Sequence, residues 1–354
     1  MLGLVDRICW GPDNAIQCFP GALASAMRYL GNKTSDNYLM GISGGAFLTI
    51  WGLPWSHANT DMLVIGDEPV RRAFEALGMN WASLGRQNAV LTDGWKDLFR
   101  RHIVESIDRA VPVIAKGIIG PPECSLVIGY EEDGAVLHGW SYYQIVSHFY
   151  SGDPEKPFRK ENWADDCFGL ILIGDKNPWL TPHPRQVLED ALRWAIILAY
   201  TPEWVVLGNS GIERFRSGLA AYDAMADALL RDIDFPPGNL SVLTDRCGTI
   251  ANDGIPLMEM KRAQAASFLR EMAALSLHGS DALLEAAARY EQEVALLHPA
   301  SEILPLTYSP EAERMRLAER SFRNEIAGIV RKARQLEEQA VACLQQALIQ
   351  INIA

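Results

Sequence analysis

The stretch that decides how this chain is organised is residues 16–31, IQCFPGALASAMRYLG. Pro20 favours the first turn of a helix, because its fixed φ is already helical and the N–H that it lacks would have no partner there. Gly31 marks the other end. Apolar residues that could share one face recur between them, at Leu23, Met27 and Leu30. We therefore predict a helix with a buried face and with Cys18 at its entrance.

The position of Cys18 suggests a chemical role. The first turn of a helix combines the positive end of the helix dipole with backbone N–H groups that lack helical partners. Such surroundings lower the pKa of a thiol and prepare it as a nucleophile. The alternative is that Cys18 is a small apolar filler beside a buried helix, the commoner role of a free cysteine. This stretch alone leaves both interpretations open.

Length and composition indicate an ordinary globular protein. The 354 residues exceed the usual size of one domain, so two domains are expected. The formal net charge of -12 and the pI near 5.1 disfavour a nucleic-acid or anionic-membrane binder, since such surfaces need clustered Lys and Arg. We expect no nucleic acid and no membrane among the partners.

The sequence also predicts a cytoplasmic protein, and we expect it to hold no metal and no cofactor. The first ten residues include Asp6 and Arg7 and offer no apolar region typical of a secretory signal. The best hydrophobic runs, 40–55 and 194–200, are too short or too rich in Gly, Ser and Pro to span a bilayer. The six cysteines are scattered without a CxxC motif, which favours reduced thiols and argues against a cysteine zinc site.

The character of the sequence changes near residue 180. Before it, short apolar runs alternate with Gly and Pro, whereas the sequence after TPHP at 181–184 is almost continuously helical. We predict an α+β domain at 1–180, in which the Cys18 helix packs on an antiparallel sheet, followed by an all-α helical bundle at 181–354.

The predicted elements of the first domain include a hairpin. Helices are expected at 68–77 and 95–110, and strands at 111–119, 125–130, 135–143 and 168–174. The acidic turn at 131–134 ends in Gly and joins the middle two strands. In the second domain we expect helices at 184–200, 212–231, 257–276, 281–297 and 311–348.

The last predicted helix carries a heptad-like seam. Its apolar residues are Phe322, Ile326, Ile329, Ala333, Leu336 and Ala340. Such a seam buries itself against another helix, and the core of the helical bundle is the favoured interpretation. The alternative is a homodimer contact through this helix. Arg262, Arg270 and Glu271 are expected on a solvated helix face.

The apolar stretch at 38–55 contains four glycines, among them Gly44 and Gly45. Glycines so placed allow positive φ or close backbone approach. The stretch is either a binding loop or a tightly packed bend, and we slightly favour the loop. Gly44 and Gly45 are therefore candidate substrate-binding residues.

Several short motifs, in their order along the chain, resemble a known family. They are the Cys18 helix ending in Leu-Gly, MGISGGAF at 40–47, GPPE at 120–123, LVIGY at 126–130 and LHGW at 137–140. They resemble the N-terminal domain of the butirosin biosynthesis protein H family over about residues 8–180. Residues 218–222 and 261–266 also resemble the helical segment that often accompanies this domain.

The resemblance implies a fold similar to papain-like and bacteriocin-processing cysteine peptidases. The characterised family member is implied to be an acyltransferase, which moves an aminoacyl group from an acyl carrier protein thioester to an aminoglycoside amine. In papain-like sites the nucleophilic Cys opens the central helix and a His begins a facing strand. Cys18 fits the first role. The strand start, where peptidase relatives would place the His, reads Glu123-Cys124-Ser125 here. The position where they would place the acid that orients the His falls near His138.

We therefore expect thiol-dependent acyl transfer, or related amide or thioester chemistry, in small-molecule biosynthesis. Cys18 would form the acyl-enzyme and Glu123 or His138 would move protons. His138 shares a strand face with Trp140, a candidate substrate contact together with Asp13, Asn14 and Gln17, whose alternative role is in a turn or cap. Substrates would be small molecules or peptides, with an acyl carrier protein as a further partner.

Two other functions stay open at the level of the sequence. One is a non-catalytic protein that binds a peptide or small ligand on a degenerate cysteine-peptidase-like fold. The other is a structural or assembly role built on the long last helix.

Overall fold

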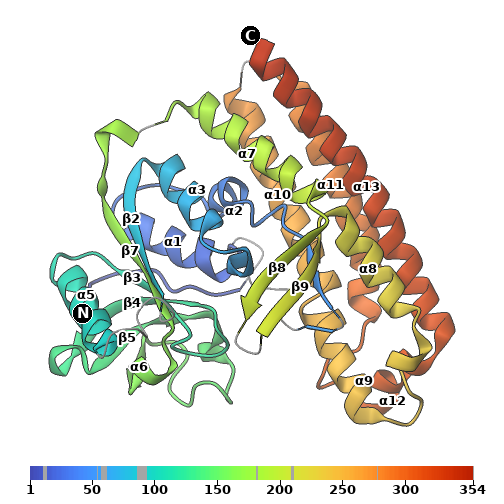
Figure 1. Ribbon diagram of the computed structural model, residues 1–354, viewed down its shortest axis with the longest axis horizontal. Coiled ribbons are helices and arrows are strands. Elements are labelled where there is room, and N and C mark those ends of the chain that lie inside the picture. Colours follow the sequence, from blue (N-terminus) through green and yellow to red (C-terminus); the bar gives the residue numbers. More distant parts are fainter. Residues whose placement is uncertain are drawn as a thin grey trace. The chain divides into compact units, whose positions relative to one another are not determined.

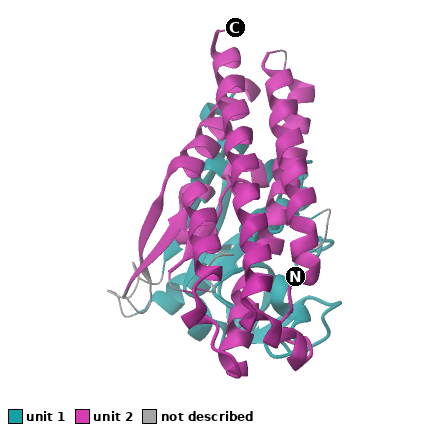
Figure 2. Ribbon diagram, turned by 90° about the vertical axis from the view of Figure 1, so that its right-hand side faces the viewer, with its two compact units in different colours: residues 1–39, 70–182 teal, residues 40–69, 183–354 magenta. Residues whose placement is uncertain are grey.

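The protein is described by a computed structural model (Figure 1). The structure describes residues 1–10, 14–53, 55–56, 62–85, 94–180, 182–208, 211–276 and 278–353. The chain forms two compact units, Met1–Leu39 with Val70–Pro182 and Met40–Pro69 with His183–Ala354 (Figure 2). The second unit thus includes a segment that the sequence analysis assigned to the first domain. Among the described helices, none is both long and apolar enough to cross a membrane.

The first unit is a mixed α+β structure built on an antiparallel sheet. Within the described residues the strand order is β2-β7-β3-β4-β5-β6. The strands are β2 (Met79–Gly85), β3 (Val113–Lys116), β4 (Cys124–Glu131), β5 (Val136–Ser141), β6 (Phe158–Glu161) and β7 (Gly169–Lys176). The helices are α1 (Cys18–Tyr29), α2 (Asp36–Ser43), α3 (Glu68–Leu77), α5 (Trp95–Asp108) and α6 (Trp163–Asp166), and the division between the units falls within α2 and α3.

The central strands of this sheet are covered on both faces. Phe99 and Ile103 of α5 share a core with Val127 of β4. Leu126 precedes Val127 in β4, so its side chain points to the opposite face of the sheet, and it is also fully buried. Helix α1 packs on β4 and β3 (Figure 1). The prediction that the Cys18 helix packs on an antiparallel sheet is confirmed.

The predicted hairpin is confirmed as well. β4 and β5 pair antiparallel, with Ser125 opposite Ser141 and Glu131 opposite Val136. The 3-10 turn Glu132–Gly134 joins them, and Gly134 adopts a positive φ of 86° there. Glycine suits this position because an L side chain rarely adopts such a conformation. The sequence analysis missed β2 and β6.

The second unit combines long helices with a small sheet of order β1-β9-β8. Its strands are β1 (Ile50–Gly52), β8 (Glu203–Gly208) and β9 (Gly211–Ser217). Its helices are α7 (Pro184–Tyr200), α8 (Leu219–Leu229), α9 (Leu240–Cys247), a π-helix (Gly248–Asn252), α10 (Ile255–Leu275), α11 (Ser280–Ile303), α12 (Glu311–Met315) and α13 (Arg320–Ile353). The long helices α10, α11 and α13 lie side by side (Figure 2).

The sheet corrects the expectation that this part of the chain is all-α. The stretch expected as a helix from residue 212 begins with strand β9, and the helix starts only at Leu219. The physical reason is local. Val205 and Val206 favour a strand, and the pairing of β8 with β9 gives both their backbone partners.

The seam of α13 lies inside this unit. Ile326, Ala333 and Ala340 are fully buried, and Phe322 and Ile326 belong to a core shared with α8 and α11 residues. Four of the six predicted seam residues thus show the burial that the bundle-core interpretation predicts, whereas Ile329 and Leu336 are only partly buried. A homodimer through the same helix stays a prediction.

Arg262 on α10 corrects another expectation, because its side chain is fully buried. Its Nε lies 2.7 Å from Glu337 Oε2 on α13, and its Nη1 donates to the carbonyl oxygen of Ala46 at 2.8 Å. Its Nη2 donates to Thr49 Oγ1 at 2.6 Å and to the Tyr222 hydroxyl at 2.9 Å. By contrast, Arg270 pairs with Glu291 on the exposed face, as expected.

A second buried carboxyl completes this cluster. Glu293 on α11 accepts a hydrogen bond from the Tyr222 hydroxyl at 2.6 Å and lies 3.7 Å from Arg262 Nε. Burial raises the pKa of Glu293 well above its usual value, and the nearby Glu337 carboxylate raises it further. This shift favours the protonated form of Glu293 beside Arg262 and Glu337.

Replacement of the two glutamates by glutamine should change the free energy of unfolding in opposite directions. We expect Glu293→Gln to raise the free energy of unfolding at neutral pH by about 1–3 kcal/mol, because the amide replaces a neutral acid whose deprotonation in the unfolded chain favours unfolding. Glu337→Gln should lower it by about 3–5 kcal/mol, because it leaves Arg262 buried without its charged partner. Urea denaturation of both variants measures the difference.

The pH dependence provides the control. A raised folded-state pKa gives stability that is fully present below the unfolded pKa of Glu and is lost as pH rises toward the folded value. Glu293→Gln should remove this part of the pH dependence. Equal losses of stability in the two variants, with unchanged pH dependence, would contradict the assignment of the proton to Glu293.

Candidate functional site

Cys18 is the first residue of α1, as the sequence predicted. Gln17 precedes it with extended backbone angles, φ -97° and ψ 135°, and every residue from Cys18 to Met27 is buried. Cys18 itself is 4% exposed. The thiol therefore lies where the backbone N–H groups of a first turn converge.

The chain segment that leads into Cys18 is fixed from two directions. Asp36 Oδ2 accepts a hydrogen bond from the Ala15 backbone N–H at 2.8 Å. The Tyr142 hydroxyl donates to the carbonyl oxygen of the same residue at 2.8 Å. Both backbone groups of Ala15 are thus held by side chains from separate elements, which sets the direction in which the chain enters α1.

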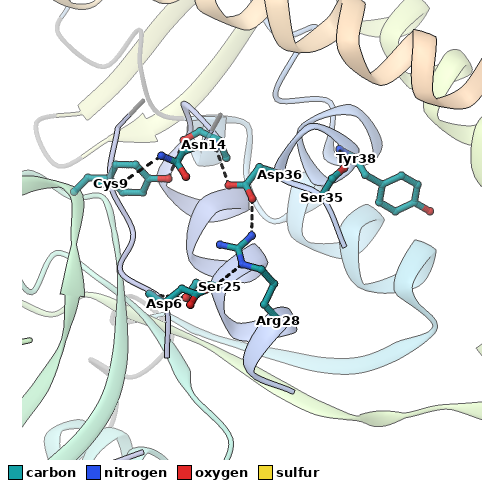
Figure 3. A network of polar contacts seen from close by, with 10 residues as sticks. Asp6, Cys9, Asn14, Ser25, Arg28, Ser35, Asp36 and Tyr38 are labelled. Carbon is teal, nitrogen blue, oxygen red and sulfur yellow. Dashed lines mark hydrogen bonds and ion pairs between the residues drawn. The ribbon is translucent and has the colours of Figure 1, made fainter. Parts of the chain in front are cut away.

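Asp36 is itself held by a short ionic chain (Figure 3). Its Oδ1 lies 2.7 Å from Arg28 Nη1, and Arg28 Nε lies 2.9 Å from Asp6 Oδ2. Ser25 on α1 donates to the Asp6 carbonyl oxygen at 2.5 Å. These contacts join the N-terminal segment and α2 to both ends of α1.

Tyr142 is the buried centre of this site. Its side chain is 1% exposed, and a Cβ on Gly21 of α1 would overlap its hydroxyl. Burial raises the pKa of Tyr142 well above its usual value, and the negative charge that Cys18, Asp36, Cys9 and Glu123 can carry raises it further. The phenol therefore stays neutral and acts as a hydrogen-bond donor.

Glu123 lies at the start of a sheet strand. It directly precedes β4 and is 8% exposed, and its carbonyl oxygen accepts the Gly117 N–H at 2.9 Å. Cys18 and Glu123 both contribute to the raised pKa of Tyr142, and a direct pairing of the predicted nucleophile with this predicted proton carrier stays a prediction.

His138 has a different partner. Its Nε2 lies 2.9 Å from Glu131 Oε1, and Arg159 binds the other oxygen of that carboxylate. His138 precedes Tyr142 by four positions, which corresponds to roughly 13 Å of extended strand. A dyad of His138 with Cys18 stays a prediction that these contacts do not support.

The predicted substrate contacts near Cys18 have structural partners. Asn14 Nδ2 donates to Cys9 Sγ at 3.5 Å, and Trp140 Nε1 donates to the Val5 carbonyl oxygen at 3.2 Å. Gln17 is the N-cap residue of α1 and is 2% exposed. Asp13 lies outside the described residues.

The glycine-rich stretch has the tightly packed form. Gly44 has a positive φ of 87°, and a Cβ there would overlap the indole of Trp194, whose Nε1 donates to the Ser43 carbonyl oxygen at 3.3 Å. Gly45 packs on Met40 and Met62. Both glycines belong to the second unit and are buried, so the contacts explain them by packing.

Sequence reasoning missed the residues that hold Ala15. Asp36 follows Ser35 at the start of a helix, where an acid is usually explained by the helix dipole. Tyr142 follows a strand of aromatic and apolar residues, where a tyrosine is usually core. Only the fold brings both to one backbone position.

The groups that the site offers are oxygen and sulfur atoms. Among the residues that the structure describes, no three or more His, Cys, Asp or Glu side chains are grouped to hold a metal ion. All six cysteines are free thiols.

A scan against models of protein families finds no match, and a search of curated proteins finds none either.

The contact of Gly21 with Tyr142 can be tested by a double-mutant cycle. Gly21→Ala should lower the free energy of unfolding by about 1–3 kcal/mol through overpacking. Tyr142→Phe should lower it by a similar amount, about 1–3 kcal/mol, because the Ala15 carbonyl loses its donor. In the double variant Phe makes room for the methyl group, so the combined loss should fall short of the sum by about 1 kcal/mol.

Gly328→Ala is the matched control for this cycle. A Cβ at Gly328 on α13 meets open space, so alanine should stabilise the helix by about 0.5–1 kcal/mol. Additive losses for Gly21→Ala and Tyr142→Phe, measured by the same urea denaturation, would show that the two residues do not constrain each other.

Proposed function

We propose that the protein is a thiol-dependent acyltransferase that carries its acyl group on Cys18. The observation that carries the proposal is the position of Cys18 at the first residue of a buried helix, with its approach segment held by Asp36 and Tyr142. Rigid positioning of a nucleophile beside first-turn N–H groups is what acyl transfer needs, because the negative charge of the tetrahedral intermediate develops there.

The reaction balances without an added redox partner. The Cys18 thiolate attacks the carbonyl carbon of a thioester, the bond to the donor sulfur breaks, and the donor leaves as a thiol after gaining a proton. An acceptor amine then attacks the acyl-enzyme, the bond to Cys18 breaks, and the amine gives up a proton. Glu123, which is buried directly before β4, is the group that we assign to these proton transfers.

A non-catalytic binding protein is the second candidate. Two observations favour it. Cys18 is buried, which hinders access of a substrate carbonyl to the thiol, and the Tyr142 hydroxyl already donates to the Ala15 carbonyl oxygen instead of to a substrate. A ligand would then be recognised beside α1 without a covalent step. Reactivity of the thiol separates the two functions.

The test measures covalent chemistry at Cys18. Wild-type protein incubated with an aminoacyl thioester of N-acetylcysteamine should gain the mass of the aminoacyl group, and a primary amine should discharge it. Cys18→Ala should gain no mass, whereas Cys124→Ala, which removes another buried thiol, should react like the wild type. Glu123→Gln should slow discharge by about 10²-fold.

Alkylation by iodoacetamide gives an independent readout. In an acyltransferase the rate at Cys18 should rise with an apparent pKa well below the free-thiol value of about 8.5. His138→Gln should leave this profile unchanged, because His138 is paired with Glu131. Labelling of Cys18 only above the free-thiol pKa, with no acyl adduct, would favour the binding protein.

A further inference from the structure

The second unit contains a cavity that the proposed function does not use. It has a volume of about 300 Å³ and lies between the first turn of α7, the end of α10 and the last turn of α13. Its described lining residues are His183, Pro184, Arg185, Leu188, Met272, Leu275, Ser276, His278 and Ile351. All of them belong to the second unit. At about 300 Å³ it reaches the lower end of the size range of small-molecule sites.

The lining divides into an apolar base and a polar rim. Leu188, Met272 and Ile351 are 3%, 3% and 2% exposed and form the base. His183, Arg185 and His278 are exposed and form the rim. A ligand that fits both parts has an apolar body and a polar end.

The rim presents hydrogen-bond donors held in place by its own contacts. Arg185 Nε lies 3.0 Å from Glu189 Oε1, and its Nη2 donates to the Ile351 carbonyl oxygen. Among the described residues nothing pairs with its Nη1. His183 Nδ1 accepts the Arg185 backbone N–H at 3.2 Å, so the ring N–H is on Nε2.

The charges in the lining indicate which polar group of a ligand the cavity prefers. One guanidinium and two imidazoles line the cavity, and its described lining contains no carboxylate. A guanidinium binds carboxylate oxygens more strongly than neutral acceptors. Glu189 Oε1 occupies the Nε side of the Arg185 guanidinium, so a ligand carboxylate would meet its Nη1 side. A ligand cation would be repelled by the guanidinium there, and an alcohol would use only part of the donor set.

We propose that this cavity binds a small amphiphilic carboxylate, with its apolar chain on Leu188, Met272 and Ile351 and its carboxylate at Arg185. Octanoate, an eight-carbon carboxylate, is a ligand of this class. The proposal does not depend on the acyltransferase activity, because it rests on groups of the second unit alone.

The experiment compares three ligands that share one chain. Octanoate, 1-octanol and octylammonium are titrated into the full-length protein by calorimetry, below the concentrations at which they form micelles. Octanoate should bind about tenfold or more tightly than octanol, as a charge-assisted hydrogen bond to Arg185 requires. Octylammonium should bind more weakly than both. Equal binding of all three, or tightest binding of the cation, would overturn the proposal.

Three variants on α7 test the role of Arg185. Arg185→Gln should weaken octanoate about tenfold and leave octanol within about twofold. Glu189→Gln breaks the same ion pair but keeps the guanidinium, so it should bind octanoate at least as tightly as the wild type. Arg193→Gln removes an exposed arginine elsewhere on α7 and should change nothing. An unchanged affinity in Arg185→Gln would exclude the assigned carboxylate position.

The location is tested on the unmodified protein. With methyl-labelled methionine, octanoate should shift the Met272 resonance, assigned from a Met272→Leu variant, and leave Met225 of α8, outside the cavity lining, unmoved. Saturable binding that does not move Met272 would place the ligand elsewhere and overturn the proposal.

Discussion

The second unit depends on one buried charge, the guanidinium of Arg262. Its donors reach the backbone of Ala46, the side chain of Thr49, the Tyr222 hydroxyl on α8 and Glu337 on α13. A buried arginine is tolerated only where it is paired with a carboxylate and hydrogen-bonded, so these contacts limit the arrangements in which the elements can pack. The long helices and the segment before β1 are therefore positioned by polar contacts as well as by their apolar faces.

The first unit has a smaller centre of the same kind, at the backbone of Ala15. A neutral phenol holds its carbonyl and a carboxylate holds its N–H, and Arg28 holds the carboxylate. The result is a fixed entry into α1, so the position of Cys18 is set by backbone contacts. The sequence analysis considered the position of Cys18 together with a facing histidine. In the structure Asp36 and Tyr142 position the thiol whether or not a histidine faces it.

The parts of the fold that local patterns decide could be predicted from the sequence. Proline, glycine and apolar spacing gave the Cys18 helix, and an acidic turn with Gly134 gave the β4–β5 hairpin. Arg262 could not be placed, because α10 is buried on most of its surface and spacing alone then distinguishes no solvated side. The β8–β9 pair was missed for a related reason, since its strands satisfy each other through pairing that no single stretch reveals.

The candidate site divides in the same way. Cys18 could be found because a helix start is a local feature, whereas Asp36 and Tyr142 act from distant positions on one backbone unit. Burial raises the pKa of Tyr142 as it does that of Glu293, and the neutral phenol of Tyr142 is a hydrogen-bond donor beside acidic groups. In the first unit this donor is already used by the Ala15 carbonyl. Stabilisation of an oxyanion at Cys18 would then fall to the N–H groups at the start of α1, where the helix dipole assists them.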